Sequence, residues 1–240
     1  MAQGHPERFT LLYEIFGKTL DFATMDRKLK KWLEWLKVIH DEIQDIVMAK
    51  RDFSEVQNLI KSNPKLHQPS SFYQYLARTY VSHVTIGLRR QLKSDSQSIS
   101  FARLLTEMID NPAALSRGYY VGLYRGPVVE GFANQDFNKF ADPTANHIKA
   151  SFVCDDLACL REATKRCEEF ADRRVAHRDK REPKELPTFS ELDSCVELLD
   201  KLYVKYHLLF HAQDMVSLLP AREYDWKKIF RQPWIPAEEA

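Results

Sequence analysis

The sequence is poor in glycine and cysteine and carries almost no net charge, and each scarcity excludes a class of protein. With 7 glycines and 11 prolines in 240 residues, it is neither collagen-like nor a low-complexity disordered chain. The 35 Lys and Arg residues against 34 Asp and Glu leave a charge of +1, which argues against a protein that holds nucleic acid over its whole surface. A polyanion site must therefore be local. With 44% hydrophobic residues, we expect a globular protein.

Long apolar runs are absent as well. No stretch approaches the ~20 apolar residues of a membrane helix, and the first residues lack the basic segment and apolar core of a signal peptide. We therefore expect a cytoplasmic protein without membrane contact. The four cysteines, separated by 5, 8 and 28 residues, match no zinc-site pattern, and we expect reduced thiols in a core: Cys154, Cys159, Cys167 and Cys195.

The prolines leave room for four long helical regions, between residues 6–64, 69–112, 143–183 and 187–220. Apolar residues in the first and last regions recur at spacings of three and four, which places them on one helix face. In the first region these are Leu29, Trp32, Leu36, Ile39, Ile43 and Ile46, and in the last they are Leu192, Val196, Leu199, Tyr203, Tyr206 and Phe210. A capping box of Thr188 and Glu191 predicts where the last helix begins, and we expect it to end near residue 213.

The second region predicts a long helix followed by a short one. Ser70 or Ser71 is the expected N-cap of the long helix, and Ser98 or Ser100 that of the short one, which ends before Asn111. A strict four-residue spacing marks the long helix: Phe72, Leu76, Tyr80, Val84, Leu88 and Leu92. No β alternation is present in these regions. The sequence therefore predicts an all-α, antiparallel helical bundle that forms a single domain over residues 1–240.

Two segments depart from the bundle pattern. Residues 112–143 contain four of the glycines among tyrosines, which predicts an irregular loop insertion or a short hairpin. The spacing of those glycines suggests a phosphate cradle, but the Lys-Ser/Thr of a P-loop is missing. Residues 221–240 form a tail in which Trp226, Phe230 and Trp234 are costly to leave in water, so we expect it to dock on the bundle.

The third region contains the strongest signal for chemistry. Its apolar stripe consists of Val153, Leu157, Leu160, Ala163, Cys167 and Phe170. Continued at the same spacing, this stripe reaches Arg174 and then His177. The run from residue 173 to 184 holds six Lys or Arg residues against two acidic ones, a local excess of +4. Arginine binds phosphate with permanently charged N–H groups, and histidine titrates near neutral pH. The alternative is a solvated helix end whose cations complement the helix dipole.

An Arg/His pair of this kind suits cleavage of RNA without a metal ion or other cofactor. The 2′-hydroxyl attacks the adjacent phosphorus, His177 moves a proton as general acid or base, and Arg173 or Arg174 stabilises the charge that develops on the phosphoryl oxygens.

Two other motifs in the sequence, one kinase-like and one metal-site-like, are discounted. The kinase-like string His177-Arg178-Asp179 lacks the asparagine and the glycine-rich loop of a kinase. His207 and His211 lie four residues apart, but further metal ligands are not indicated.

The string ADRRVAHRD resembles the helix-end motif of the HEPN (higher eukaryotes and prokaryotes nucleotide-binding) superfamily, and most of all its abortive-infection branch, the AbiU-like HEPN proteins. The segment from Gly87 to Leu105, GLRRQLKSDSQSISFARLL, is similar to that family's link between a long helix and a short one. The resemblance covers half to two-thirds of the chain. It implies an all-α bundle, commonly a homodimer with facing sites, and a metal-independent endoribonuclease of phage defence or of a toxin-antitoxin system.

The resemblance also implies a site, from which one residue is missing. The family places an arginine four to six residues before the histidine, and those positions hold Phe170, Ala171 and Asp172. Arg173 substitutes only if the helix end is distorted, and Asp172 matches a polar residue that often follows the family's arginine. The expected catalytic residues are thus His177, Arg173 and Asp172, and the expected phosphate-binding residues are Arg174, Arg178 and Lys180.

Two kinds of function follow from this site. The first is an endoribonuclease. The second is a non-catalytic module that binds RNA, a nucleotide or a protein partner such as an antitoxin.

The second region carries three further basic residues, His83, Arg89 and Arg90. They either extend the basic surface or pair with a helix C-terminus, and their role stays open at this stage.

Overall fold

A computed structural model describes residues 26–124, 127–176, 179–180 and 185–234, and within these ranges the chain is mostly helical. The long helices are α2 (Arg27–Ser62), α3 (Ser71–Leu92), α7 (Ala150–Phe170) and α8 (Phe189–His211). Shorter helices are α4 (Phe101–Asp110), α5 (Arg117–Gly122) and α6 (Pro127–Phe137). Between and after them lie the short turns η1 (Pro64–Leu66), η2 (Pro112–Ala114), η3 (Ala171–Val175) and η4 (Trp226–Arg231). The described ranges contain no strand, only an isolated bridge between Ser116 and His147. The all-α prediction is confirmed.

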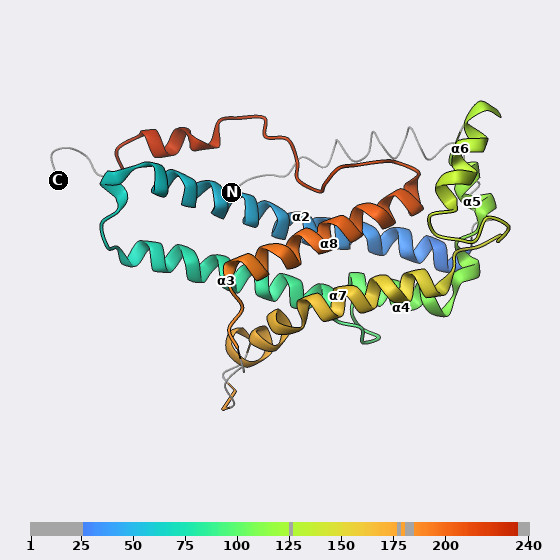
Figure 1. The fold of residues 1–240 in the computed structure, drawn as a ribbon, viewed down its shortest axis with the longest axis horizontal. Coiled ribbons are helices and arrows are strands. Elements are labelled where there is room, and N and C mark those ends of the chain that lie inside the picture. Colours follow the sequence, from blue (N-terminus) through green and yellow to red (C-terminus); the bar gives the residue numbers. More distant parts are fainter. Residues whose placement is uncertain (1–25, 125–126, 177–178, 181–184, 235–240) are drawn as a thin grey trace.

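The long helices pack as an antiparallel bundle (Figure 1). The helices α2 and α3 form a hairpin joined by the turn η1 (Pro64–Leu66), and α8 packs against both. Helix α7 contacts α3, α4 and α8, so its end lies beside α3. Gly87 permits close approach of α3 to α2, because a Cβ atom there would lie 2.7 Å from the side chain of Ile46. None of the helices in the described ranges is long and apolar enough to cross a membrane.

The stripes predicted from spacing form the core. Every stripe residue of α2 and α8 is at most 2% exposed, and the α3 stripe is buried from Tyr80 to Leu92. Phe72, at the outer end of α3, is 45% exposed. The predicted caps are also present: Ser70 accepts from the N–H of Phe72, Ser100 accepts from that of Arg103, and Thr188 forms the capping box. Helix α8 ends at His211, where Ala212 adopts a left-handed conformation.

The prediction of an irregular loop or hairpin at residues 112–143 is wrong, because this segment contains short helices. This segment contains the 3-10 turn η2 (Pro112–Ala114), α5 and α6. Arg117 holds them together: its guanidinium donates to carbonyl oxygens of Asn134, Asp142 and Ala145 and lies 4.7 Å from the ring of Phe137. Contacts between residues up to 28 positions apart therefore stabilise short helices that the glycine content alone disfavours.

The tail is docked along α2 as far as it is described. Arg222 pairs with Asp52, and the Nζ atom of Lys227 lies 2.8 Å from a carboxylate oxygen of Glu55. The guanidinium of Arg222 also lies 4.3 Å from the ring of Trp226. The ring of Trp234 also lies 6.4 Å from that of Phe72 on α3, although Phe230 and Trp234 remain 42% and 61% exposed. Residues 235–240 of the predicted tail lie outside the described residues.

Candidate functional site

Helix α7 changes its winding where the basic run begins. It is followed by a π-helical turn, η3 (Ala171–Val175), in which the N–H of Ala176 donates to the carbonyl of Ala171 at 2.8 Å. The N–H of Asp179 then donates to the carbonyl of Arg173 at 3.1 Å. The helix end is therefore distorted at Arg173. Turns of this kind are rare and occur frequently at functional sites.

The buried face of α7 differs from the predicted stripe. Ala163 is exposed, and Thr164 is buried in its place, with its hydroxyl donating to the carbonyl of Leu160 at 2.7 Å. Two turns later Ala171 is fully buried, whereas Phe170 is half-buried. The buried residues of this face, Leu160, Thr164, Cys167 and Ala171, therefore follow spacings of four, three and four, and the last of them is Ala171 rather than Phe170. The predicted inward position of Arg174 is only partly confirmed, because this residue is half-buried in η3.

An ion pair joins the α7 end to α3. The Nε atom of Arg89 donates to the carboxylate of Asp172, and 24% and 46% of these side chains are exposed. Arg89 belongs to the segment 87–105 and Asp172 to the string 171–179, the two segments that suggested the resemblance to the HEPN family. From the sequence alone the role of Arg89 was open, because only tertiary structure brings together residues 83 positions apart.

Arg173 also has a partner within the fold. One of its guanidinium nitrogens lies 2.9 Å from a carboxylate oxygen of Glu169, one helical turn earlier. Both side chains are partly exposed, at 24% and 30%. The structure thus brings Asp172, Arg173 and Arg174 together in one turn, beside Arg89. Lys180 is exposed further along the chain, and His177 and Arg178 lie outside the described residues.

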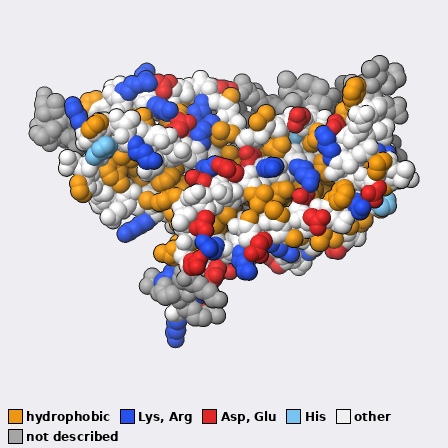
Figure 2. Space-filling model, viewed as in Figure 1, with side chains coloured by type: hydrophobic (Ala, Val, Ile, Leu, Met, Phe, Trp, Pro, Cys, Tyr) orange, Lys and Arg blue, Asp and Glu red, His pale blue; other side chains and the backbone are white. Residues whose placement is uncertain are grey.

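Charge on the visible face of the molecule is mixed. In Figure 2, Lys and Arg side chains are interleaved with Asp and Glu side chains and do not form one broad basic field. This agrees with the net charge of +1. A site for a polyanion must therefore depend on a few cations at one place.

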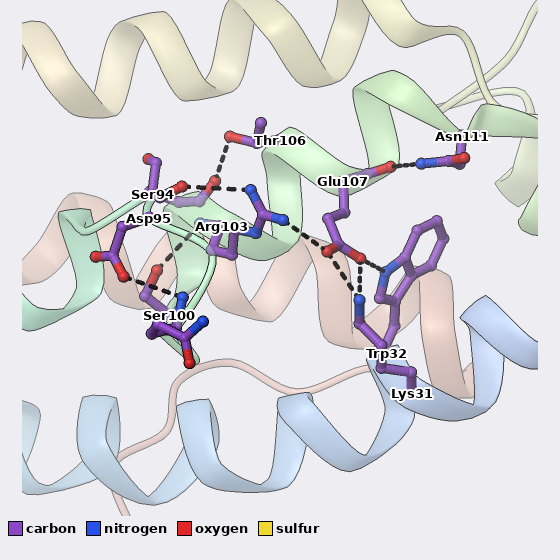
Figure 3. A network of polar contacts seen from close by, with 11 residues as sticks. Lys31, Trp32, Ser94, Asp95, Ser100, Arg103, Thr106, Glu107 and Asn111 are labelled. Carbon is purple, nitrogen blue, oxygen red and sulfur yellow. Dashed lines mark hydrogen bonds and ion pairs between the residues drawn. The ribbon is translucent and has the colours of Figure 1, made fainter.

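A buried carboxylate was missed by the sequence reasoning. Glu107 of α4 is 8% exposed and accepts hydrogen bonds from Lys31 Nζ at 2.8 Å, Trp32 Nε1 at 3.0 Å and Arg103 at 3.0 Å (Figure 3). Burial raises the pKa of Glu107, but the hydrogen bonds from Lys31 and Trp32 and the charges of Lys31 and Arg103 outweigh it, so the pKa is lowered. The cluster ties α4 to α2. Its signal in the sequence is a lone acidic residue on an otherwise apolar helix face.

The histidine pair of α8 is packed against the bundle. The ring centroids of His207 and His211 lie 4.7 Å apart. Burial lowers the pKa of His211 to about 4, with smaller effects from His207, Lys37 and His40. Burial also lowers the pKa of His207, which the hydrogen bond to the carbonyl of Gln213 opposes. Within the described part of the chain, no group of three or more His, Cys, Asp or Glu residues is placed to hold a metal ion.

We expect the protein to lose stability as the pH falls from about 6.5 to 4. The unfolded chain takes up a proton on His211 near pH 6.5, whereas the folded protein does so only near pH 4. The loss from this residue is at most about 3 kcal/mol. Urea unfolding of the wild type and of His211→Gln at pH 7.5 and pH 4.5 measures it. An equal pH dependence in both proteins would show that His211 does not contribute.

No protein-family model matches the chain, and searches among curated proteins and among solved structures also found no match. The function is therefore inferred from the residues of the chain itself.

Proposed function

We propose that the chain is a metal-independent endoribonuclease of the HEPN type, serving phage defence or a toxin-antitoxin system, with its site at the end of α7. The observation that carries this proposal is the ion pair between Arg89 and Asp172. It joins the two sequence segments that resemble the family. The π-helical turn at Arg173 supports it further, because it supplies the distortion under which this arginine can replace the missing one.

The chemistry follows from the residue types. His177 moves a proton while the 2′-hydroxyl of RNA attacks the neighbouring phosphorus, and Arg173 or Arg174 stabilises charge on the phosphoryl oxygens. Arg178 and Lys180 add phosphate contacts. Arg173 must exchange Glu169 for phosphate, and both side chains of this pair are partly exposed, at 24% and 30%. The pair of Asp172 with Arg89 anchors the turn while this happens.

The second candidate is a binding module without catalysis. The observation that favours it is the occupancy of positions 170–172 by Phe170, Ala171 and Asp172, none of which is the arginine of the family pattern. The pairing of Arg173 with Glu169 also favours it. In this case the same cations bind RNA, a nucleotide or an acidic partner chain.

An RNA cleavage assay in EDTA separates the two candidates. We expect the wild type to cut single-stranded RNA and to leave DNA of the same sequence intact, because DNA lacks the attacking 2′-hydroxyl. The products should end in a 2′,3′-cyclic phosphate and a 5′-hydroxyl. RNA that is bound but never cut would favour the binding module, and cutting only after addition of Mg²⁺ would contradict the proposed mechanism.

A further inference from the structure

Two thiols meet in the interface between α7 and α8. The Sγ atoms of Cys167 on α7 and Cys195 on α8 lie 3.5 Å apart, and the two residues are 1% and 3% exposed. The other two cysteines, Cys154 and Cys159, are exposed, so the expectation of four core thiols is wrong for these two. Nothing in the proposed cleavage chemistry uses Cys167 or Cys195.

The buried pair lies beside an opening to solvent. An open cavity of about 390 Å³ is lined by Cys167 together with Ala163, Arg166, Glu169 and Glu191. A small oxidant such as hydrogen peroxide fits a space of this size, which gives it a route to a thiol that is otherwise covered. The exposed cysteines lie earlier on α7 and do not line this cavity.

We propose that Cys167 and Cys195 are a modification site at which a peroxide forms a reversible disulfide. One thiolate attacks a peroxide oxygen, the O–O bond breaks, and hydroxide leaves and takes up a proton to become water. The sulfenic acid that results is attacked by the second thiolate, so that an S–S bond forms, the S–O bond breaks and a second water leaves. Two thiols and one hydrogen peroxide thus give one disulfide and two waters.

The contact geometry favours this bond over reaction at separate sites. A disulfide requires the sulfurs to approach to about 2.05 Å, so the two Sγ atoms, now 3.5 Å apart, must move closer by about 1.5 Å. The hydrogen bond from the Cys167 thiol lowers the pKa of Cys195, although burial and the charge of Glu191 oppose it. Because the thiolate is the reactive form, Cys195 is the sulfur that ionises more readily, whereas Cys167, whose pKa the same hydrogen bond and burial raise, is the one that lines the cavity.

The bond would link the end of α7 to α8 across 28 residues, including the basic run that begins at Arg173. Closing a loop of this length restricts the unfolded chain and raises stability. The cross-link would form whether or not the protein acts on RNA.

The test uses the variant Cys154→Ser/Cys159→Ser, in which the buried pair holds the only thiols. After treatment with hydrogen peroxide, unfolding and alkylation, we expect a protein about 2 Da lighter that takes up no alkylating agent. Trypsin should then release the peptide beginning at Cys167 joined to the peptide ending at Lys201, and dithiothreitol should separate them. The melting temperature should rise by roughly 5 °C on oxidation and return on reduction.

A matched control adds Cys195→Ser to this variant, which should give neither the joined peptide nor the rise in melting temperature. If Cys195→Ser unfolds the protein, the mass measurement on Cys154→Ser/Cys159→Ser still tests the proposal. Alkylation of both buried thiols after peroxide treatment would overturn the proposal. So would their conversion to sulfinic acids, or a disulfide formed only between two protein molecules.

Discussion

Replacing His177 with alanine is expected to lower the rate of RNA cleavage in EDTA by about 10²–10⁴-fold. The reason is chemical: His177 is the residue of the motif that titrates near neutral pH, so it is the group suited to move the proton of the 2′-hydroxyl or of the leaving oxygen. RNA binding should change little, because the arginines and the lysine of the basic run supply the proposed phosphate contacts. Single-turnover cleavage of a labelled RNA measures the rate apart from binding.

His67→Ala is the matched control. His67 is an exposed histidine at the turn between α2 and α3, so its loss should leave cleavage at the wild-type rate. Cleavage by His177→Ala at the wild-type rate would remove His177 from the mechanism and contradict the proposed catalytic site.

Replacing Glu107 with alanine is expected to lower the free energy of unfolding by about 3 kcal/mol, at the low end of the loss for a buried ion pair. The substitution leaves the buried N–H of Trp32 without an acceptor and removes the carboxylate that neutralises Lys31 and Arg103 (Figure 3). Lys31 is 43% exposed and regains water, which keeps the loss below that of a fully buried pair. Urea unfolding followed by circular dichroism measures the change.

Two variants test the cause of that loss. Glu107→Gln keeps an acceptor for Trp32 but removes the charge, so we expect a smaller loss than in Glu107→Ala. Glu34→Ala removes a carboxylate from the exposed pair with Lys37, and it should cost less than about 1 kcal/mol. An unfolding midpoint of Glu107→Ala equal to that of the wild type would show that the cluster does not stabilise the fold.

Local signals predicted the bundle well. Spacings of three and four residues report helix faces directly, which is why the stripes of α2 and α8 coincide with the core. Ser70, Ser100 and Thr188 act on backbone N–H groups two or three residues away, so their roles are visible in the sequence.

Features that depend on distant residues could not be predicted in this way. Helices α5 and α6 depend on Arg117 reaching carbonyls as far as Ala145, and the glycines alone indicate a loop. The cluster at Glu107 joins residues 75 and 76 positions apart. In α7, Ala163 and Thr164 are equally compatible with the spacing, and the packing against neighbouring helices decides which one is buried.

In the candidate site, too, the local features could be predicted from the sequence and the contacts with distant residues could not. Its basic run and its position at a helix end follow from composition and periodicity, and Asp172, Arg173 and Arg174 do share one turn. The partners of these residues did not follow: Arg89 comes from another helix, and the pair of Arg173 with Glu169 was only one of several possible pairs. His177 and Arg178 remain predictions from the sequence.

The salt dependence of RNA binding tests most directly whether the end of α7 binds phosphate, on which both candidate functions depend. With three or four contacts, the wild type should show a log–log slope of roughly −2 to −3, since each phosphate neutralised on a single strand contributes about −0.7. The variant Arg174→Ala/Arg178→Ala/Lys180→Ala, which leaves the ion pairs of Asp172 and Arg173 in place, should flatten this slope by about 2. Removing three exposed lysines elsewhere, in Lys61→Ala/Lys65→Ala/Lys201→Ala, should leave it unchanged. An equal slope in the wild type and the first variant, with both folded, would contradict the account and leave the basic run as a solvated helix end.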